Sequence, residues 1–148
     1  MPVDVVTETV INRPCPEVAG YTTDQSNAPE WYDKISSVEW KTLPPTSVGS
    51  RFAFVAQFLG RRLEYTYEVT ELLPGERLVM RTEQGPFPME TTYTWESLAA
   101  DQTRMSLRNR GEPKGFGAVA GPLMAFAMRR ANRKDLAKLK LVLEARRP

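Results

Sequence analysis

The sequence predicts an α+β protein in which a curved, seven-stranded antiparallel sheet packs against one long C-terminal helix. Three observations lead to this prediction. Apolar and polar residues alternate from Gly49 to Arg110, which is the pattern of strands with one buried face. The segment from Pro122 to Arg146 is instead rich in alanine, leucine, methionine, arginine and lysine, which favour helix. Between the first two strands, two short proline-initiated segments predict short helices.

The individual elements follow from local pattern. Valine, threonine and isoleucine recur from Val3 to Asn12, so a first strand is expected there. The two short helices cover residues 14–24 and 27–32, the second with Asn27 as its cap and Pro29 in its first turn. The remaining strands are expected over residues 35–42, 51–59, 63–70, 77–84, 89–96 and 103–110. A helix over residues 122–146 would span roughly 37 Å, long enough to cross the whole domain.

The outward faces of the last two strands carry opposite charges. Glu90 and Glu96 lie on the first of these strands, and Arg104, Arg108 and Arg110 lie on the second. Opposite charges on neighbouring strands favour pairing. The pattern therefore indicates a meander that is solvated on its outer face and apolar on its inner face.

Bulk composition limits the class of function. The 148 residues suit one domain, 1–148, and are 41% hydrophobic and 26% charged, as in ordinary globular proteins. The net charge is only +2, and no basic stripe is interleaved with aromatics, so nucleic acid is not expected as a partner. One cysteine rules out an intramolecular disulfide, and the absence of histidine removes the commonest metal ligand and general base. We expect no metal and no cofactor.

The expected location is the cytoplasm. The N-terminal residues MPVDVVTETV lack the basic and long apolar regions of a signal peptide. No apolar run reaches the roughly twenty residues of a membrane span, so integral membrane association is not expected. A homodimer is allowed by the sequence.

Three segments carry a family resemblance that covers essentially the whole sequence. They are VINRPCPEVAGYTTDQSNAPEW near the N-terminus, VGSRF at the third strand, and MRRANRKDLAKLKLVLEA at the end. With the order of elements, they resemble the helix-grip fold of the START-like (SRPBCC) superfamily, in its bacterial polyketide cyclase/dehydrase-like branch. The resemblance implies a cavity between sheet and helix that holds a lipid, polyketide or similar small molecule. It carries no catalytic motif over to this sequence.

The alternation along the strands and the spacing along the long helix assign side chains to an inner face. Phe116, beside the glycine-rich entrance to the helix, is added to them as part of a lid. The predicted ligand-binding residues are Phe52, Phe54, Ala56, Tyr65, Tyr67, Met80, Thr82, Thr91, Tyr93, Trp95, Met105, Asn109, Phe116, Met124, Met128 and Asn132.

Two interpretations of this inner face stay open. Its aromatic side chains are large enough to fill the interior, which would make it a plain packed core. Its hydroxyl and amide groups favour a cavity instead, because an unpartnered buried polar group costs about 1–3 kcal/mol.

Single residues leave similar alternatives. Asn132 either binds a ligand or bonds a tyrosine or backbone group, and Asp135 pairs with a neighbouring arginine or lysine. Trp31 is expected to anchor the short helices rather than to plug the cavity mouth. Cys15 is expected to be structural, because no base accompanies it.

The sequence favours a protein that binds a small hydrophobic or amphipathic molecule. Phe87 is expected to form the lid of the cavity together with Phe116. The alternative is a cyclase/dehydratase-type enzyme in which pocket tyrosines and Asn132 polarise a carbonyl. No catalytic residue is assigned, because histidine is absent and no pair of inward carboxylates is visible. Whether the protein is an enzyme stays open. A protein-interaction module with a filled core is the third option.

Overall fold

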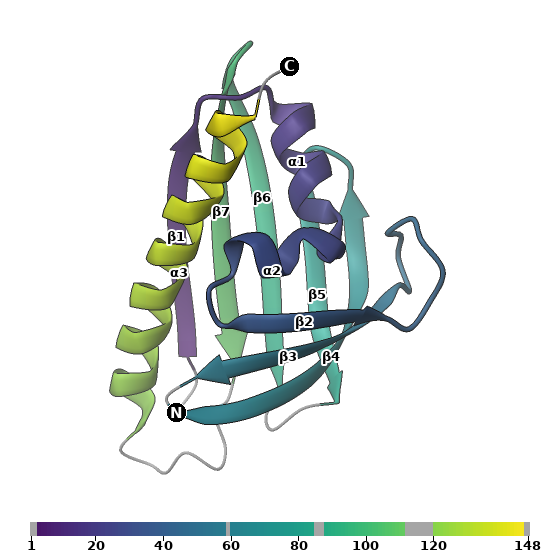
Figure 1. The fold of residues 1–148 in the computed structure, drawn as a ribbon, viewed down its shortest axis with the longest axis vertical. Helices are drawn as coiled ribbons and strands as arrows, with labels where there is room; N and C mark the ends of the chain where they lie inside the picture. Colours follow the sequence, from purple (N-terminus) through teal and green to yellow (C-terminus); the bar gives the residue numbers. More distant parts are fainter. Residues whose placement is uncertain (1–2, 59, 85–87, 112–119, 147–148) are drawn as a thin grey trace.

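The computed structural model describes residues 3–58, 60–84, 88–111 and 120–146. Its elements follow the predicted order of strand, two short helices, six strands and one long helix (Figure 1). The strands are β1 (Val3–Ile11), β2 (Ile35–Trp40), β3 (Arg51–Phe58), β4 (Arg61–Leu73), β5 (Arg77–Gln84), β6 (Met89–Ala99) and β7 (Gln102–Gly111). The helices are α1 (Cys15–Thr23), the 3-10 turn η1 (Gln25–Asn27), α2 (Ala28–Trp31) and α3 (Ala120–Ala145).

The strands form one seven-stranded antiparallel sheet in the order β1-β7-β6-β5-β4-β3-β2. The sheet is strongly curved, since β2, β3 and β4 run across the view in Figure 1 while β5, β6 and β7 run along it. Register shifts at Thr66/Tyr67 and Val69/Glu71 interrupt the pairing of β4 with β5. Such irregularities bend a strand and increase its twist, so they mark the place where the sheet turns.

The long helix α3 runs beside β1 and turns one side toward the concave face of the sheet (Figure 1). Met124, Leu139 and Leu143 are fully buried, as their helical spacing predicts. The helix begins at Ala120 rather than at the predicted Pro122. Pro122 thereby falls in the first turn, where the N–H that proline lacks would have no intrahelical partner.

The buried apolar side chains form two clusters. The larger cluster joins the C-terminal half of α3 to the short helices and to the sheet, through residues such as Leu136, Val18 and Leu107. The smaller cluster lies at the other end of α3 and consists of Val3, Val5, Met89, Met124 and Met128. The helix is therefore held at both ends by apolar packing.

Arg13 also fastens the C-terminal end of α3. Its Nε donates to the carbonyl oxygen of Leu143 at 2.9 Å, and its Nη2 donates to that of Glu144 at 2.9 Å. The Glu144 carboxylate accepts the backbone N–H of Asn12 at 2.8 Å. The last carbonyls of a helix have no intrahelical donor, so this loop satisfies groups that would otherwise lack a partner.

The two short helices are anchored from the inside. Trp31 is 1% exposed, and its ring centroid lies 4.0 Å from that of Tyr32 and 5.9 Å from that of Tyr93. The indole N–H of Trp95 donates to the Thr22 hydroxyl at 3.0 Å. Trp31 thus has the anchoring position that the sequence analysis favoured.

The predicted charge pairing on the outer face of the sheet is confirmed. Arg104 lies 2.8 Å from Glu96, and Arg110 lies 3.9 Å from Glu90, in each case between β7 and β6. The side chains of these pairs are partly exposed to solvent, so each pair contributes little to stability. These pairs match the alternation of inward and outward side chains along the strands, and they therefore support a single pairing register.

The prediction for the side chain of Asn27 is wrong. Asn27 occupies the cap position of α2, but its side chain makes no capping hydrogen bond. Its Nδ2 donates instead to the carbonyl oxygen of Tyr21 at 3.0 Å. The backbone of the preceding turn offers an acceptor within reach, and this contact joins α1 to α2.

Replacing Leu139 by alanine tests the packing of α3. Leu139 is fully buried, whereas Leu141 on the same helix is 72% exposed. We expect Leu139→Ala to lower the free energy of unfolding by about 2–5 kcal/mol, because it leaves a cavity in the core. The matched control Leu141→Ala should change it by less than about 0.5 kcal/mol. Urea unfolding followed by circular dichroism measures both, and equal losses would contradict the placement of α3.

Candidate functional site

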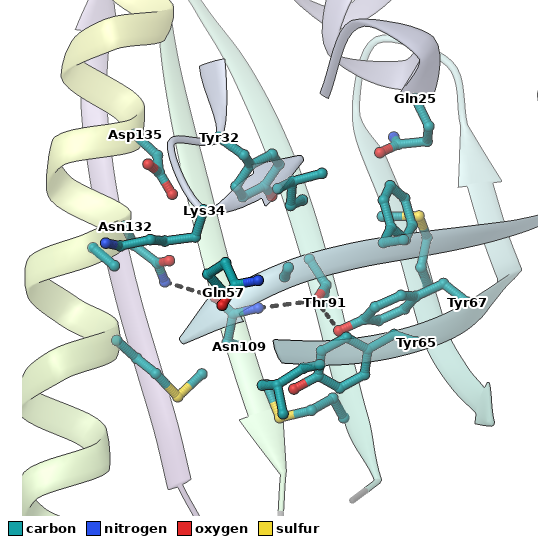
Figure 2. Close-up of a pocket in the computed structure, with 18 of the residues that line it drawn as sticks. Gln25, Tyr32, Lys34, Gln57, Tyr65, Tyr67, Thr91, Asn109, Asn132 and Asp135 are labelled. Carbon is teal, nitrogen blue, oxygen red and sulfur yellow. Dashed lines mark hydrogen bonds between the residues drawn. The ribbon is translucent and has the colours of Figure 1, made fainter. Parts of the chain in front are cut away.

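A cavity of about 150 Å³ lies between the concave face of the sheet and α3 (Figure 2). Residues of both apolar clusters contribute to its wall, so it occupies the space where the clusters meet. The lining residues are Gln25, Tyr32, Lys34, Ile35, Phe54, Ala56, Gln57, Leu63, Tyr65, Tyr67, Met80, Met89, Thr91, Tyr93, Asn109, Met128, Ala131, Asn132 and Asp135.

Aromatic rings from β3 and β4 form one apolar wall. The ring of Phe54 meets that of Tyr67 edge-on, with centroids 5.7 Å apart, and Tyr65 lies 6.0 Å from Tyr67. These contacts follow from the pairing register, in which Phe54 is directly opposite Tyr65. Edge-to-face packing of this kind stabilises aromatic neighbours and fixes the orientation of the rings.

Four polar side chains are joined by hydrogen bonds along another part of the wall, and we call them the polar chain (Figure 2). Asn132 on α3 donates from Nδ2 to Oδ1 of Asn109 on β7 at 2.6 Å. Asn109 donates from Nδ2 to Oγ1 of Thr91 on β6 at 2.9 Å. The Thr91 hydroxyl donates to the hydroxyl of Tyr67 on β4 at 3.4 Å. All three bonds therefore run in the same direction, from the helix to the far side of the sheet.

The pairing of the strands explains how these groups meet. Thr91 and Asn109 are direct partners in the antiparallel ladder between β6 and β7, so their side chains project side by side from the same face. Asn132 is 7% exposed on the inner side of α3. The predicted partner of Asn132, a tyrosine or a backbone group, is wrong, because β7 places an amide there.

A second polar contact involves two tyrosines. The hydroxyls of Tyr32 and Tyr93 lie 2.6 Å apart, so one of them donates to the other. Burial raises the pKa of both hydroxyls above the ordinary value. Both tyrosines are therefore neutral hydrogen-bonding groups at physiological pH.

Asp135 is the buried carboxylate of the cavity wall. It is 3% exposed, and its Oδ1 accepts the backbone N–H of Asp33 at 3.0 Å. Burial raises the pKa of Asp135 to about 6, and the Asp33 N–H bond opposes part of this rise. The predicted pairing with arginine or lysine is wrong for the part of the sequence that the structure describes. Lys134 and Lys138 act on it only from a distance.

Many of the predicted site residues line the cavity. They are Phe54, Ala56, Tyr65, Tyr67, Met80, Thr91, Tyr93, Asn109, Met128 and Asn132. Phe116 and Phe87 lie outside the described residues. Five other predicted residues do not line it, namely Phe52, Thr82, Trp95, Met105 and Met124.

Each of these five residues either packs in an apolar cluster or makes a hydrogen bond away from the cavity. Phe52 and Met105 are fully buried in the larger cluster, and Met124 is fully buried in the smaller one. Trp95 lies beneath α1, where its indole binds Thr22. The Thr82 hydroxyl accepts the Met89 N–H at 2.9 Å, so the β5–β6 hairpin satisfies it. Inward parity alone does not distinguish a core position from a cavity position.

The sequence analysis missed several residues that complete the wall. Leu63 and Met89 have inward parity in the strand pattern, and that signal was available. Tyr32 and Lys34 come from the segment that connects α2 to β2, which has no periodicity to reveal its direction. Gln57 reaches the wall from the end of β3, where its backbone N–H donates to the Lys34 carbonyl at 2.8 Å.

A wider depression of about 800 Å³ lies outside the sheet, between α1 and the loop around Pro44 and Pro45. Its polar side chains are engaged locally, since Thr46 donates to the Thr23 carbonyl at 3.1 Å and Asp24 accepts the Ser26 N–H at 3.0 Å. The cavity between the sheet and α3 is smaller, but polar groups from both the helix and the sheet converge on it. We therefore regard the cavity as the functional site.

Within the described ranges, no three histidine, cysteine, aspartate or glutamate side chains come close enough together to hold a metal ion. Nor does any described helix combine the length and the hydropathy that a membrane span requires.

The strand order, the long helix and the cavity between them define a START-like helix-grip protein. The family model for polyketide cyclase / dehydrase and lipid transport matches residues 2–144, and the protein belongs to this family. A search of curated proteins found no match.

Solved structures share the fold at low sequence identity. A protein from Thermus thermophilus is 21% identical, with a TM-score of 0.84 over 97% of this chain and 99% of that chain. A START superfamily protein from Mycobacterium smegmatis is 15% identical, with a TM-score of 0.84 and coverage of 95% and 97%. The Zhui aromatase/cyclase from Streptomyces is 15% identical, with a TM-score of 0.82 and coverage of 97% and 94%. Identities this low establish the fold alone.

The raised pKa of Asp135 predicts a pH-dependent stability. Because the pKa of Asp135 is about 6 in the folded protein and 3.8 for an ordinary exposed aspartate, the folded state binds this proton more tightly. The stability contributed by Asp135 therefore increases as the pH falls from about 6 toward 4, and it is lowest above pH 6. The difference between the two pKa values corresponds to a free energy on the order of 3 kcal/mol.

Asp135→Asn should remove this dependence, because asparagine keeps an oxygen for the Asp33 N–H but carries no charge. We expect the variant to be more stable than the parent by up to about 3 kcal/mol at pH 7, with the difference shrinking toward pH 4. Urea unfolding at several pH values measures it, and the exposed Asp101→Asn serves as control. A stability difference that did not vary with pH would contradict the raised pKa.

Proposed function

We propose that the protein binds a small amphipathic molecule, about one ring in size, in the cavity between the sheet and α3. The observation that supports this most directly is the combination of apolar walls with hydroxyl and amide groups that converge on one cavity. Pockets for small molecules commonly have this composition. The family description, which names polyketide cyclases, dehydrases and lipid transport, supports the same class of ligand.

The volume of the cavity limits the size of the ligand. A cavity of roughly the same size in another protein binds benzene, so the 150 Å³ here accepts a single ring or a short chain segment. Pockets for larger ligands measure about 300–1,000 Å³. A whole lipid or a multi-ring polyketide would therefore extend beyond the cavity unless wall residues such as Met128 and Tyr65 moved. Unbranched methionine side chains adapt readily to such changes.

The cavity also counts against a protein-interaction module with a filled core. The side chains of the inner face do not occupy all the space that they enclose. Polar groups such as Thr91, Asn109 and Asn132 line that space, where leucine would pack better in a plain core.

A second candidate function is a cyclase/dehydratase-type reaction, and one observation favours it. The Asp135 carboxyl lines the cavity and has a pKa of about 6, close to the value that suits a general acid–base group near neutral pH. The Tyr67 hydroxyl would polarise the carbonyl. Asn132, which the sequence analysis assigned to that task, already donates its amide proton to Asn109.

Blocking the cavity tests the binding function. Ala56 lines the cavity, whereas Ala53 on the same strand has the opposite parity. We expect one-ring probes such as phenol, benzaldehyde and indole to raise the melting temperature of the parent protein, because they bind only the folded state. Ala56→Leu should weaken that binding at least about tenfold, since added side-chain volume occupies the ligand's space.

The control Ala53→Leu should bind the probes as the parent does. Thermal unfolding and nuclear magnetic resonance titration measure the shift and the affinity. The proposal is overturned if no probe binds the parent protein, or if Ala56→Leu and Ala53→Leu bind alike.

Exchange of the methyl protons of acetophenone in deuterated water tests the second candidate. If Asp135 and Tyr67 assist enolisation, the protein should accelerate this exchange, and Asp135→Asn should abolish the acceleration without abolishing binding. Asp101→Asn should exchange the protons as fast as the parent. An exchange rate equal to that in buffer would rule out acid–base catalysis on this ketone.

A further inference from the structure

The direction of the polar chain determines what the Tyr67 hydroxyl offers to the cavity. The Thr91 hydroxyl accepts a hydrogen bond from Asn109 and donates one to the Tyr67 oxygen. Because Tyr67 accepts that bond, its own proton is not used between the two hydroxyls. Asn132, Asn109 and Thr91 therefore each donate a hydrogen bond to the next residue of the polar chain.

The Tyr67 proton has no acceptor among the residues that the structure describes. The ring of Tyr67 packs against the rings of Phe54 and Tyr65 in the cavity wall. Its hydroxyl points toward Thr91 (Figure 2). Burial raises the pKa of Tyr67, so the group keeps its proton at physiological pH. A buried donor without an acceptor is costly, and a ligand that brings an acceptor removes that cost.

The helix side of the cavity carries an amide and a carboxylate. Asn132 uses its Nδ2 to bind Asn109. The Asp135 carboxylate lines the wall one turn further along α3. The sheet side therefore presents the Tyr67 donor, and the helix side carries the Asp135 carboxylate as an acceptor. A ligand oxygen that accepts a hydrogen bond meets the Tyr67 proton when it faces the sheet side.

Resting on the proposed binding function, we infer that the cavity selects one-ring ligands that carry a carbonyl oxygen, with the Tyr67 hydroxyl as the hydrogen-bond donor. Thr91, Asn109 and Asn132 are positioning residues that hold this hydroxyl toward the ligand. Hydrogen bonds in series polarise one another, so the chain also makes Tyr67 a stronger donor than a solitary tyrosine.

A matched pair of ligands isolates the hydrogen bond. Acetophenone carries a carbonyl group where α-methylstyrene, of nearly the same shape, carries a methylene group. We expect the parent protein to bind acetophenone about fivefold more tightly than α-methylstyrene, which is the contribution of one neutral hydrogen bond. The ratio of the two affinities, measured by nuclear magnetic resonance titration, cancels general effects of a variant on the cavity.

Three variants separate the roles. Tyr67→Phe should reduce the ratio to about one, because it removes the donor but keeps the ring. Thr91→Val should lower the ratio by breaking the polar chain, whereas Thr91→Ser should preserve it by keeping the hydroxyl. The carbonyl stretching frequency of bound acetophenone provides a second readout. It should be lowered in the parent and in Thr91→Ser, and should return toward its apolar-solvent value in the other two variants.

The outcomes distinguish this inference from the proposed function. If both ligands bind the parent equally and the stretching frequency is not lowered, the carbonyl selectivity is wrong while the binding function stands. If neither ligand binds, the binding function fails and the selectivity fails with it. If Thr91→Val and Thr91→Ser behave alike, the polar chain does not position Tyr67.

Discussion

The contact between α3 and the concave face of the sheet is the interaction on which the rest of the structure depends. The helix buries Leu139 and Leu143 against one end of the sheet and Met124 against the other. Arg13 holds the C-terminal carbonyls of the helix through the loop that follows β1. Because both ends are fixed, the middle of the helix is free to carry polar residues such as Asn132 and Asp135 without loss of the fold.

The cavity results from a mismatch between this straight helix and a strongly bent sheet. The irregular pairing of β4 with β5 allows β2, β3 and β4 to turn across the other strands (Figure 1). A rod packed into such a curve contacts it at some places and leaves space at others. The space that remains, about 150 Å³, is lined by both apolar and polar side chains. A plain core would not leave so much volume, because interiors pack to nearly the density of crystals.

The polar residues of the wall reduce stability locally. The buried Asp135 carboxylate disfavours folding at neutral pH, as its raised pKa shows. Thr91, Asn109 and Asn132 occupy positions where leucine or valine would bury more apolar surface. Such positions, where the demands of stability are not met, are typical of functional sites.

The sequence by itself determined the order of the elements, the inward parity of most strands and the buried side of α3. These features repeat with the period of a strand or a helix, so Tyr67, Thr91 and Met128 were assigned to the inner face correctly. Only the tertiary structure decided which inward residues line space and which fill it. Trp95 and Thr82 do not line the cavity, because α1 and the backbone of the β5–β6 hairpin supply their hydrogen-bond partners. Tyr32 lines the cavity although it lies in a connecting segment whose sequence has no periodicity. Burial in the folded protein raises the pKa of Asp135. These outcomes depend on contacts between segments that are distant in the sequence, and the local sequence pattern does not predict such contacts.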